Sequence, residues 1–552
     1  MQNLFIQKNI RSLCVFFFFF SFYLLFMKGS PNVDSYASFM TARSVVTHGT
    51  IVLSKKQSQD ANLPHRGTAI TNPVHVGDKD YSRYGIGWAG SMVPFYLVGK
   101  SVSLFFKQIN SEFITLFIIC TIGPFLTALF LTFLYRFCLE LKFSENIALF
   151  TIMISAFTTI IPSYSRNPFV ETLDALLILM IVYQLHFFCL DRGKKHLLYM
   201  GLFTAYLVTT KIYNCIIVLP LIIWIVWFSL FVKREKVQEA VKAVSLLLIP
   251  ISLSIIFILI LNYIKFGSAI GTGYEGKSGL ICMFEGLYGF LFSYGKSIFI
   301  YNPILILVVA TMGDVIKQKK YLAFGIILIF FTYICFFSVF NNWMAGPWGT
   351  RYLFPIISVM MILVPFGLKS LGNQTEKIKK ALLIVIISFG FFINLPTFFV
   401  DVYKWELLGR NSGTFNRHEM TYLPSLSQTT GSWYLFKSSI KKMPLPALCL
   451  INIVSMATIK TLYHFANRNF KKNCPVGNVV NNQIYLDKYD ESDIWPLRMM
   501  RGSVIKDNGT VAILPGGRGL KIVSVIVSLF LLSSMLASCR WYAKSRFNTT
   551  CR

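Results

Sequence analysis

Long apolar blocks separated by short polar connections run along most of the chain. About 20 apolar residues in a helix are enough to cross the core of a bilayer. The first block, at about 10–27, contains the unbroken phenylalanine run 16–20. Because Lys8 and Arg11 precede it, we expect the N-terminus to be cytoplasmic. No small-residue cleavage site follows this block, which favours an uncleaved anchor over a signal peptide.

The same pattern recurs to the end of the chain and predicts an all-α polytopic membrane protein with about 11–13 transmembrane helices. Further spans are expected at about 113–135, 145–162, 172–189, 197–210, 213–231, 243–263, 298–316, 321–340, 352–367, 381–399, 444–462 and 521–538.

The segment 86–106 is only moderately apolar, is interrupted by Pro94 and carries Lys100. A charge at the centre of a spanning helix costs about 2.5–3.5 kcal/mol on insertion scales. We therefore predict a juxtamembrane helix that lies in the interface. A full crossing is the alternative, and it would reverse the sidedness of every later connection.

Charge supports the interface position of 86–106. With that position, counting crossings from a cytoplasmic N-terminus places the basic clusters between the spans on the cytoplasmic side, as the positive-inside rule requires. These clusters are Arg136/Lys142, Arg192/Lys194/Lys195, Lys233/Arg234/Lys236, Lys317/Lys319/Lys320, Lys377/Lys379/Lys380 and Arg468/Lys471/Lys472.

Composition excludes a cytosolic enzyme, and the distribution of charge argues against a nucleic-acid-binding protein. The chain has 53 Lys+Arg against 24 Asp+Glu, a formal net charge of +29, but only 14% charged residues and 55% apolar ones. Soluble globular proteins carry about a quarter charged residues, so a cytosolic enzyme is excluded. The cations lie in short clusters between apolar blocks rather than in one stripe, which argues against nucleic acid as a partner and for contact with membrane lipids.

The chemically varied polar segments then fall on the opposite, extracytoplasmic side. They include a large first external loop at about 28–112 and segments at 163–171, 264–297, 341–351 and 400–443. We divide the chain into a transmembrane core, 1–440, and a C-terminal region, 441–552, with about two further spans around a polar segment at 475–520. Counting crossings leaves the basic tail 540–552 outside, against the charge rule.

The first external loop begins with a candidate general base, Asp34. Partial desolvation near the membrane surface would raise its basicity, which suits removal of a proton from a hydroxyl group. Asp also caps helices readily, so the alternative is the N-cap of a helix over 35–46.

Later in this loop, the sequence from Tyr81 to Gly87 indicates a turn that enters the interface helix. Arg83 could bind a phosphate through two oxygens, or could snorkel to the interface. His65, His75, Asp78 and Asp80 lie near one another, but their spacing matches no metal motif. No metal or other cofactor is therefore expected, although a divalent metal would be compatible with these residues.

Ionisable residues also lie at the mouths of later spans. Glu171 and Asp174 are three residues apart and share one helical face, and at this depth such residues usually face a cavity or a partner. The alternative is a pair neutralised by Arg166 or Lys211 for packing. Arg351 adds a cation on the same side, which suggests a site for an anionic amphiphile.

Several motifs resemble the GT-C class of polytopic glycosyltransferases, which use polyprenyl-phosphate sugars. The resemblance is to the family 39-like bacterial branch, akin to protein O-mannosyltransferases and the lipid A aminoarabinose transferase. In order, the matching pieces are Asp34-Ser35-Tyr36, the segment from Tyr81 to Gly87, the acidic helix start from Glu171, Thr209-Thr210-Lys211 ("LTK"), Phe292 to Pro303 ("FSPGRGLFLYSP") and Gly349-Thr350-Arg351-Tyr352 ("GxRY").

The resemblance covers about residues 1–440 and implies a GT-C-like bundle with Asp34 as catalytic base and Lys211 and Arg351 on the carrier phosphate. It also implies substrate contacts, for which the candidates are Arg83, Tyr84, Glu171, Asp174, Lys296, Tyr301, Trp343 and Tyr352. Many relatives have two adjacent acids after the first helix. Here Ser35 follows Asp34, so Asp34 acts alone or with Glu171 or Asp174.

The hypothesis is therefore an inverting transfer of a sugar from a polyprenyl-phosphate carrier to a hydroxyl of a glycan, lipid or protein acceptor. The abundance of Phe, Ile, Lys and Asn indicates an AT-rich genome and hence a bacterial inner membrane, with the site on its periplasmic face. One alternative is a transporter or flippase for a lipid-linked sugar, although we see no clear internal repeat. An inactive membrane scaffold is the other, motivated by the missing second acid.

Overall fold

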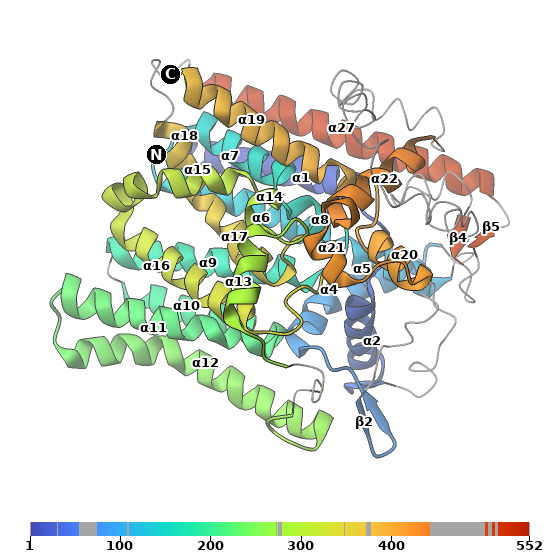
Figure 1. Ribbon diagram of the computed structural model, residues 1–552, viewed down its shortest axis with the longest axis horizontal. Helices are drawn as coiled ribbons and strands as arrows, with labels where there is room; N and C mark the ends of the chain where they lie inside the picture. Colours follow the sequence, from blue (N-terminus) through green and yellow to red (C-terminus); the bar gives the residue numbers. More distant parts are fainter. Residues whose placement is uncertain are drawn as a thin grey trace.

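The chain folds into a bundle of long helices with two small antiparallel sheets (Figure 1). The structure is a computed structural model, and it describes residues 2–29, 31–53, 74–106, 110–191, 193–271, 273, 279–346, 348–370, 377–441, 503–505, 511–513 and 517–550.

Eight helical segments among the described residues are long and apolar enough to cross a bilayer. They are Asn9–Phe26 in α1 (Gln2–Phe26), Ser111–Glu140 (α5, Ser111–Cys120, and α6, Ile122–Glu140), Val170–Leu190 in α9 (Val170–Asp191), Ile212–Val232 (η1, Ile212–Ile217; α11, Val218–Trp227; η2, Phe228–Val232), α12 (Val237–Phe266), α16 (Met312–Ser338), Arg351–Ser370 (η3, Arg351–Leu353; α17, Phe354–Met360; η4, Met361–Leu363; α18, Val364–Ser370) and Lys377–Phe398 (α19, Lys377–Asn394; η5, Leu395–Phe398). The chain is thus a polytopic α-helical membrane protein, as its hydropathy predicts.

Shorter helices complete the bundle. α7 (Glu145–Thr158) and α10 (Lys194–Thr210) replace the spans expected at 145–162 and 197–210. The span expected at 298–316 is wrong as a single helix, because the chain forms α14 (Ile298–Tyr301), α15 (Ile304–Ala310) and then the start of α16. Asn302 breaks it by leaving helical geometry and accepting a hydrogen bond from the Ile160 backbone N–H at 3.0 Å.

The polar elements gather at one end of the bundle, which we call the loop end (Figure 1). It carries α2 (Val33–His48), a three-stranded sheet in the order β1-β3-β2 (Val52–Leu53, Lys79–Tyr81, Val74–Val76), α8 (Ile161–Ser165), α13 (Met283–Phe292), α20 (Tyr403–Ser412), α21 (Arg417–Tyr422), η6 (Pro424–Leu426) and α22 (Gln428–Lys441). The N-terminus lies at the opposite end, which we call the N-terminal end.

Basic connections lie at the N-terminal end. Arg136, at the end of α6, donates a hydrogen bond to Asn9 in α1 at 3.2 Å. Lys233 lies 4.3 Å from the ring of Phe188, near the end of α9. These contacts place Arg136 and Lys233 at the N-terminal end, as expected for their two clusters. The cluster of Arg468, Lys471 and Lys472 lies outside the described residues.

The segment 86–106 forms α4 (Ile86–Ser103), which is not among the candidate spans. It packs against α2 and α5 at the loop end. Its last turns expose Leu97, Val98 and Lys100. The helix itself is as expected, and its interface position stays a prediction.

The C-terminal helix α27 (Gly517–Thr550) packs along α1 in the antiparallel sense. Ser534 contacts Ser21 at 3.0 Å, and Tyr542 donates to Glu145 at 2.6 Å, the same carboxylate that Arg11 binds. The end of α27 thus lies beside the start of α1, so the expectation that the tail 540–552 lies outside is wrong. It lies on the same side as the N-terminus, which satisfies the charge rule.

Little of the C-terminal region before α27 is described. The expected span 444–462 and most of the polar segment 475–520 lie outside the described residues, apart from the hairpin strands β4 (Ser503–Ile505) and β5 (Val511–Ile513). The division of the chain at residue 440 therefore stays a prediction.

Candidate functional site

Asp34 lies in the first turn of α2, but it is not the cap of that helix. Asn32 is the N-cap, and its side-chain oxygen accepts a hydrogen bond from the Ser35 backbone N–H at 2.8 Å. The alternative interpretation of Asp34 as a helix cap is therefore wrong. Because Asn32 performs that role, the Asp34 carboxylate is left to point into the bundle, with 32% of its side chain exposed.

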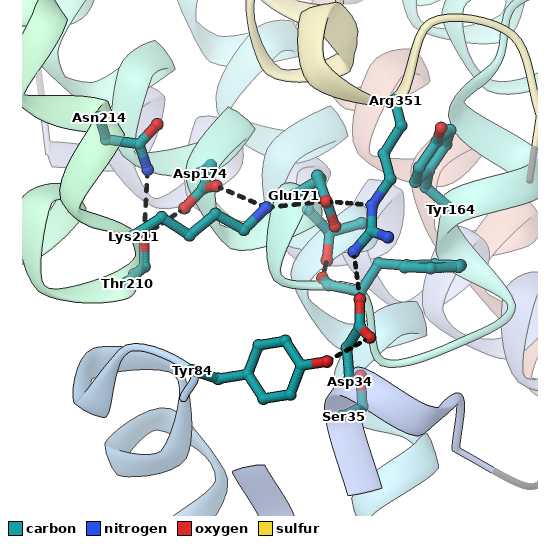
Figure 2. Close-up of polar contacts among 12 residues, drawn as sticks. Asp34, Ser35, Tyr84, Tyr164, Glu171, Asp174, Thr210, Lys211, Asn214 and Arg351 are labelled. Carbon is teal, nitrogen blue, oxygen red and sulfur yellow. Dashed lines mark hydrogen bonds and ion pairs between the residues drawn. The ribbon is translucent and has the colours of Figure 1, made fainter. Parts of the chain in front are cut away.

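Both oxygens of Asp34 are held by side chains from distant parts of the chain (Figure 2). The hydroxyl of Tyr84 donates to one oxygen at 2.7 Å, and Nη2 of Arg351 donates to the other at 2.8 Å. Two such bonds fix the direction of a carboxylate. Asp34 is thus an oriented, partly exposed acid at the loop end.

Tyr84 reaches Asp34 because the turn before α4 lies directly on the end of α10. Gly85 and Gly87 sit against the backbone of Thr209 and Thr210, where a Cβ on either glycine would overlap the threonines. Only glycine permits this close approach. It also places Tyr84 beside the segment that ends in Lys211.

Glu171 joins the two cations of the site. It lies at the start of α9, is 1% exposed, and accepts from Nε of Arg351 at 2.5 Å and from Nζ of Lys211 at 2.7 Å. Its second oxygen, Oε2, is buried with no hydrogen-bond partner among the described residues. The ring of Phe169 lies 5.6 Å from the Arg351 guanidinium and closes this side of the site.

Asp174 lies one helical turn further into the bundle and is also 1% exposed. It lies 3.8 Å from Nζ of Lys211 and accepts from the Thr210 hydroxyl at 2.6 Å. Asn214 in turn donates to Thr210 at 3.2 Å. Glu171 and Asp174 therefore share Lys211, as one of the two sequence interpretations expected.

Arg166 is not the partner of these acids. Its guanidinium donates to the backbone carbonyls of Phe26, Thr397 and Val400 at 2.6–2.7 Å. Beside it, Lys28 forms a buried ion pair with Asp401. These contacts tie the end of α1 to the end of η5.

The structure thus brings together Asp34, Tyr84, Glu171, Asp174, Lys211 and Arg351 in one continuous network (Figure 2). When all are ionised, its three carboxylates exceed its two cations by one charge. A buried cluster of this kind is expensive to desolvate and holds together only through well-aligned hydrogen bonds.

Three of the predicted substrate contacts lie in the core instead. Tyr301 is fully buried with its ring against Trp348, and its hydroxyl accepts from Thr429 at 3.2 Å. Trp343 is fully buried and edge-on to Phe290. Lys296 is 3% exposed and donates to the backbone carbonyl of Gly346 at 2.9 Å.

Of the two other predicted contacts, Tyr352 lies near Lys211, and Arg83 precedes Tyr84 in the chain. Tyr352 stacks on Phe337, and its ring lies 6.2 Å from that of Tyr213, over which Lys211 is placed. Arg83 lies beside Gly273, with its Cβ 3.2 Å from the position that a Cβ on this glycine would take.

The candidate metal ligands of the first loop form a side-chain pair. Nδ1 of His75 lies 2.5 Å from Oδ1 of Asp80 across the β2–β3 hairpin. Within the described ranges, no group of three or more His, Cys, Asp or Glu residues is placed to hold a metal. His65 lies outside those ranges.

Sequence reasoning missed Thr210 and Asn214 as parts of the network, and it missed Lys265. Nζ of Lys265, in the last turn of α12, donates to the backbone carbonyl of Tyr84 at 3.1 Å. The signal for Thr210 and Asn214 was present, because both flank Lys211 in an apolar stretch. Nothing in the sequence near Lys265 pointed to residue 84.

No family model matches the chain, and no curated protein matches it in sequence. Among solved structures, ArnT from Cupriavidus metallidurans in the apo state is similar with 9% identity and a TM-score of 0.47, over 79% of this chain and 69% of that one. The same protein bound to undecaprenyl phosphate gives 10% identity and a TM-score of 0.44, over 79% and 70%. The apo oligosaccharyltransferase of Archaeoglobus fulgidus gives 11% identity and a TM-score of 0.40, over 78% and 63%.

Proposed function

We propose that the chain is a membrane glycosyltransferase that moves a sugar from a polyprenyl-phosphate carrier to a hydroxyl acceptor, with inversion at the anomeric carbon. The observation that carries this proposal is the oriented, partly exposed carboxylate of Asp34, held between Tyr84 and Arg351. The ordered motifs that resemble the GT-C class support the same function.

In the proposed reaction, Asp34 accepts the proton of the acceptor hydroxyl while the oxygen of that hydroxyl attacks the anomeric carbon. The bond between that carbon and the phosphate oxygen breaks, and its electron pair leaves with the carrier phosphate. A positioned base contributes about 10²–10⁴-fold to such a step. The hydrogen bonds from Tyr84 and Arg351 supply the positioning.

Arg351 and Lys211 are the groups proposed to stabilise the charge that develops on the leaving phosphate. In the structure they are paired with Asp34, Glu171 and Asp174. A phosphate entering the site would compete with these carboxylates for the same guanidinium and ammonium. Glu171 holds both cations at one place, so the phosphate would meet them together.

We infer that the loop end faces the periplasm of a bacterial inner membrane, because the basic connections and both chain ends lie at the other end. The acceptor there would be a glycan, a lipid or a protein. The donor's isoprenoid tail would lie among the helices, and membrane lipids would surround the apolar spans.

The test is donor turnover by the purified protein in lipid nanodiscs, followed as release of free carrier phosphate from a polyprenyl-phosphate sugar. We expect wild type to release carrier phosphate and Asp34→Asn to be slower by about 10²–10⁴-fold, as expected for loss of a general base. Asp80→Asn is the matched control, since Asp80 is an acid of the first loop outside the network. Full activity of Asp34→Asn would refute the assigned role.

Carrier-phosphate release in nanodiscs separates the enzyme from the two alternatives, and a transport assay in sealed vesicles separates these alternatives from each other. A transporter or flippase would move the donor across a vesicle membrane without releasing carrier phosphate. An inactive scaffold would do neither.

A further inference from the structure

Two buried lysines contact the main chain beside Tyr84 and Arg351, the two residues that hold Asp34. Lys265 is 8% exposed and donates to the main chain of Tyr84, whereas Lys296 is 3% exposed and donates to the main chain of Gly346, which Arg351 contacts. The two come from different elements, α12 and the turn before α14. Each donates to a main-chain carbonyl rather than to a carboxylate.

Lys265 fixes the main chain at Tyr84. Its Nζ donates to the Tyr84 carbonyl at 3.1 Å, one residue before the glycine that rests on Thr209 and Thr210. The backbone from which the Tyr84 ring projects is therefore held from one side by α10 and from the other by α12. The ring then reaches Asp34 through its hydroxyl.

Lys296 fixes the main chain beside Arg351 in a similar way. Its Nζ donates to the Gly346 carbonyl at 2.9 Å, and Nε2 of Gln428 donates to the same oxygen at 3.0 Å. Gly346 has a φ of +127°, a region that favours glycine, and a Cβ there would lie 2.5 Å from Cβ of Arg351. The clamped carbonyl thus belongs to the residue against which the Arg351 stem packs.

An ordinary buried lysine pairs with an acid, because an isolated buried charge is costly. In the described part of the chain, neither Lys265 nor Lys296 lies within 4.0 Å of a carboxylate. Burial lowers the pKa of Lys296 from 10.5 to about 7, with Glu406 opposing the shift and Arg417 and Arg351 adding to it. Among the described residues, the Lys296 ammonium instead meets two neutral oxygens, the Gly346 carbonyl at 2.9 Å and Oε1 of Gln428 at 3.5 Å.

We propose that Lys265 and Lys296 are positioning residues that hold Tyr84 and Arg351 on the two oxygens of Asp34. This inference rests on the proposed function, in which Asp34 is the base. Neither lysine touches the reacting atoms. The positioning role of Lys296 replaces the expectation that Lys296 contacts the substrate, because its ammonium is buried against Gly346.

The experiment uses the full chain in nanodiscs with three substitutions, Lys265→Met, Lys296→Met and the control Lys233→Met. Lys233 has a side chain that is 4% exposed but lies at the N-terminal end. We expect each of the first two to lower kcat for donor turnover by about 10–100-fold, because small misplacements of a catalytic group have effects of this size. In these two variants the KM for the donor should change less than about 3-fold. The activity of the control Lys233→Met should also change less than about 3-fold.

A double-mutant cycle with Asp34→Asn decides whether the lysines act through Asp34. We expect Lys265→Met to cause no further loss in the Asp34→Asn protein. Lys296→Met should cause a smaller loss there than in wild type, because Arg351 also stabilises the leaving phosphate in the proposed reaction. Independent losses that multiply would overturn the inference. A raised KM with unchanged kcat would also overturn it, because it would indicate direct contact with the donor.

A structural readout separates this inference from the proposed function. In a cryo-EM map of Lys296→Met, the Arg351 guanidinium should leave Asp34, and in Lys265→Met the Tyr84 hydroxyl should do so. Contacts that stay in place would overturn the inference. If wild type shows no turnover, the proposed function fails while the maps still test the positions. Gln428→Leu, which removes the second donor to Gly346, serves if Lys296→Met does not fold.

Discussion

At the scale of single residues, Glu171 connects the two cations of the candidate site. One of its oxygens accepts from both Arg351 and Lys211, so this acid holds the two cations together, with Asp34 on the outer side of Arg351 and Asp174 on the outer side of Lys211. Removing one partner of a buried pair is far costlier than removing a surface pair, because the remaining charge stays buried and uncompensated.

Glu171→Gln should therefore lower the free energy of unfolding by about 3–5 kcal/mol, since two buried cations lose their shared counter-charge. Chemical denaturation in detergent measures this change. Glu112→Gln is the matched control, because Glu112 pairs with Arg43 where both side chains are about a third exposed, and such pairs contribute about 0–1 kcal/mol. Equal effects of the two substitutions would contradict the assignment of Glu171 as a buried hub.

Asp34 shows what a single residue's sequence context can and cannot predict. Its position after the first span indicated a candidate base, but the helix-cap alternative could not be excluded without knowing where the helix begins. The helix begins at Val33, capped by Asn32. A shift of two residues in the start of a helix thus decides whether Asp34 serves the backbone or the site.

At the scale of elements, the pairing of α1 with α27 connects the two ends of the chain. The Oγ atoms of Ser21 and Ser534 lie 3.0 Å apart, and Tyr542, Tyr135 and Arg11 meet on Glu145. Hydropathy predicted a helix at 521–538 but not its neighbour. The direction of that helix follows from which partner it packs on.

Ser21→Cys combined with Ser534→Cys, in a background without native cysteines, should form a disulfide on oxidation. The two Oγ atoms lie 3.0 Å apart, so the sulfurs need to approach by only about 1 Å to reach an S–S bond length. Ser21→Cys with Ser528→Cys is the control, since six residues along a helix correspond to about 9 Å. Gel mobility after proteolysis between the two sites measures the crosslink. A crosslink only in the control pair would show a different register of α27 on α1.

At the scale of the whole molecule, the basic connections lie at one end of the bundle and the candidate site at the other. A single cysteine introduced at an exposed position can report on which side of the membrane each end of the bundle lies. His48→Cys lies at the end of α2, and Lys195→Cys lies at the start of α10. A membrane-impermeant maleimide should label His48→Cys in intact cells, and Lys195→Cys only after permeabilisation, because positively charged connections stay in the cytoplasm. The reverse result would place the site in the cytoplasm and contradict the proposed function.

The sequence by itself determined that this chain crosses a membrane many times, and it predicted which connections share a side. Both properties depend on local sums, the transfer of about 20 apolar residues into lipid and the retention of cations on one side. It also marked Asp34, Glu171, Lys211 and Arg351 as polar residues at span mouths.

Only the tertiary structure decided that these residues touch. Asp34 and Arg351 are 317 residues apart in the chain, and Tyr84 meets Asp34 only because two glycines let α4 approach α10. The roles of Lys265 and Lys296 arise in the same way, from main-chain carbonyls that helix packing brings to them. Such contacts depend on how several helices pack at once, which no local pattern of residues encodes.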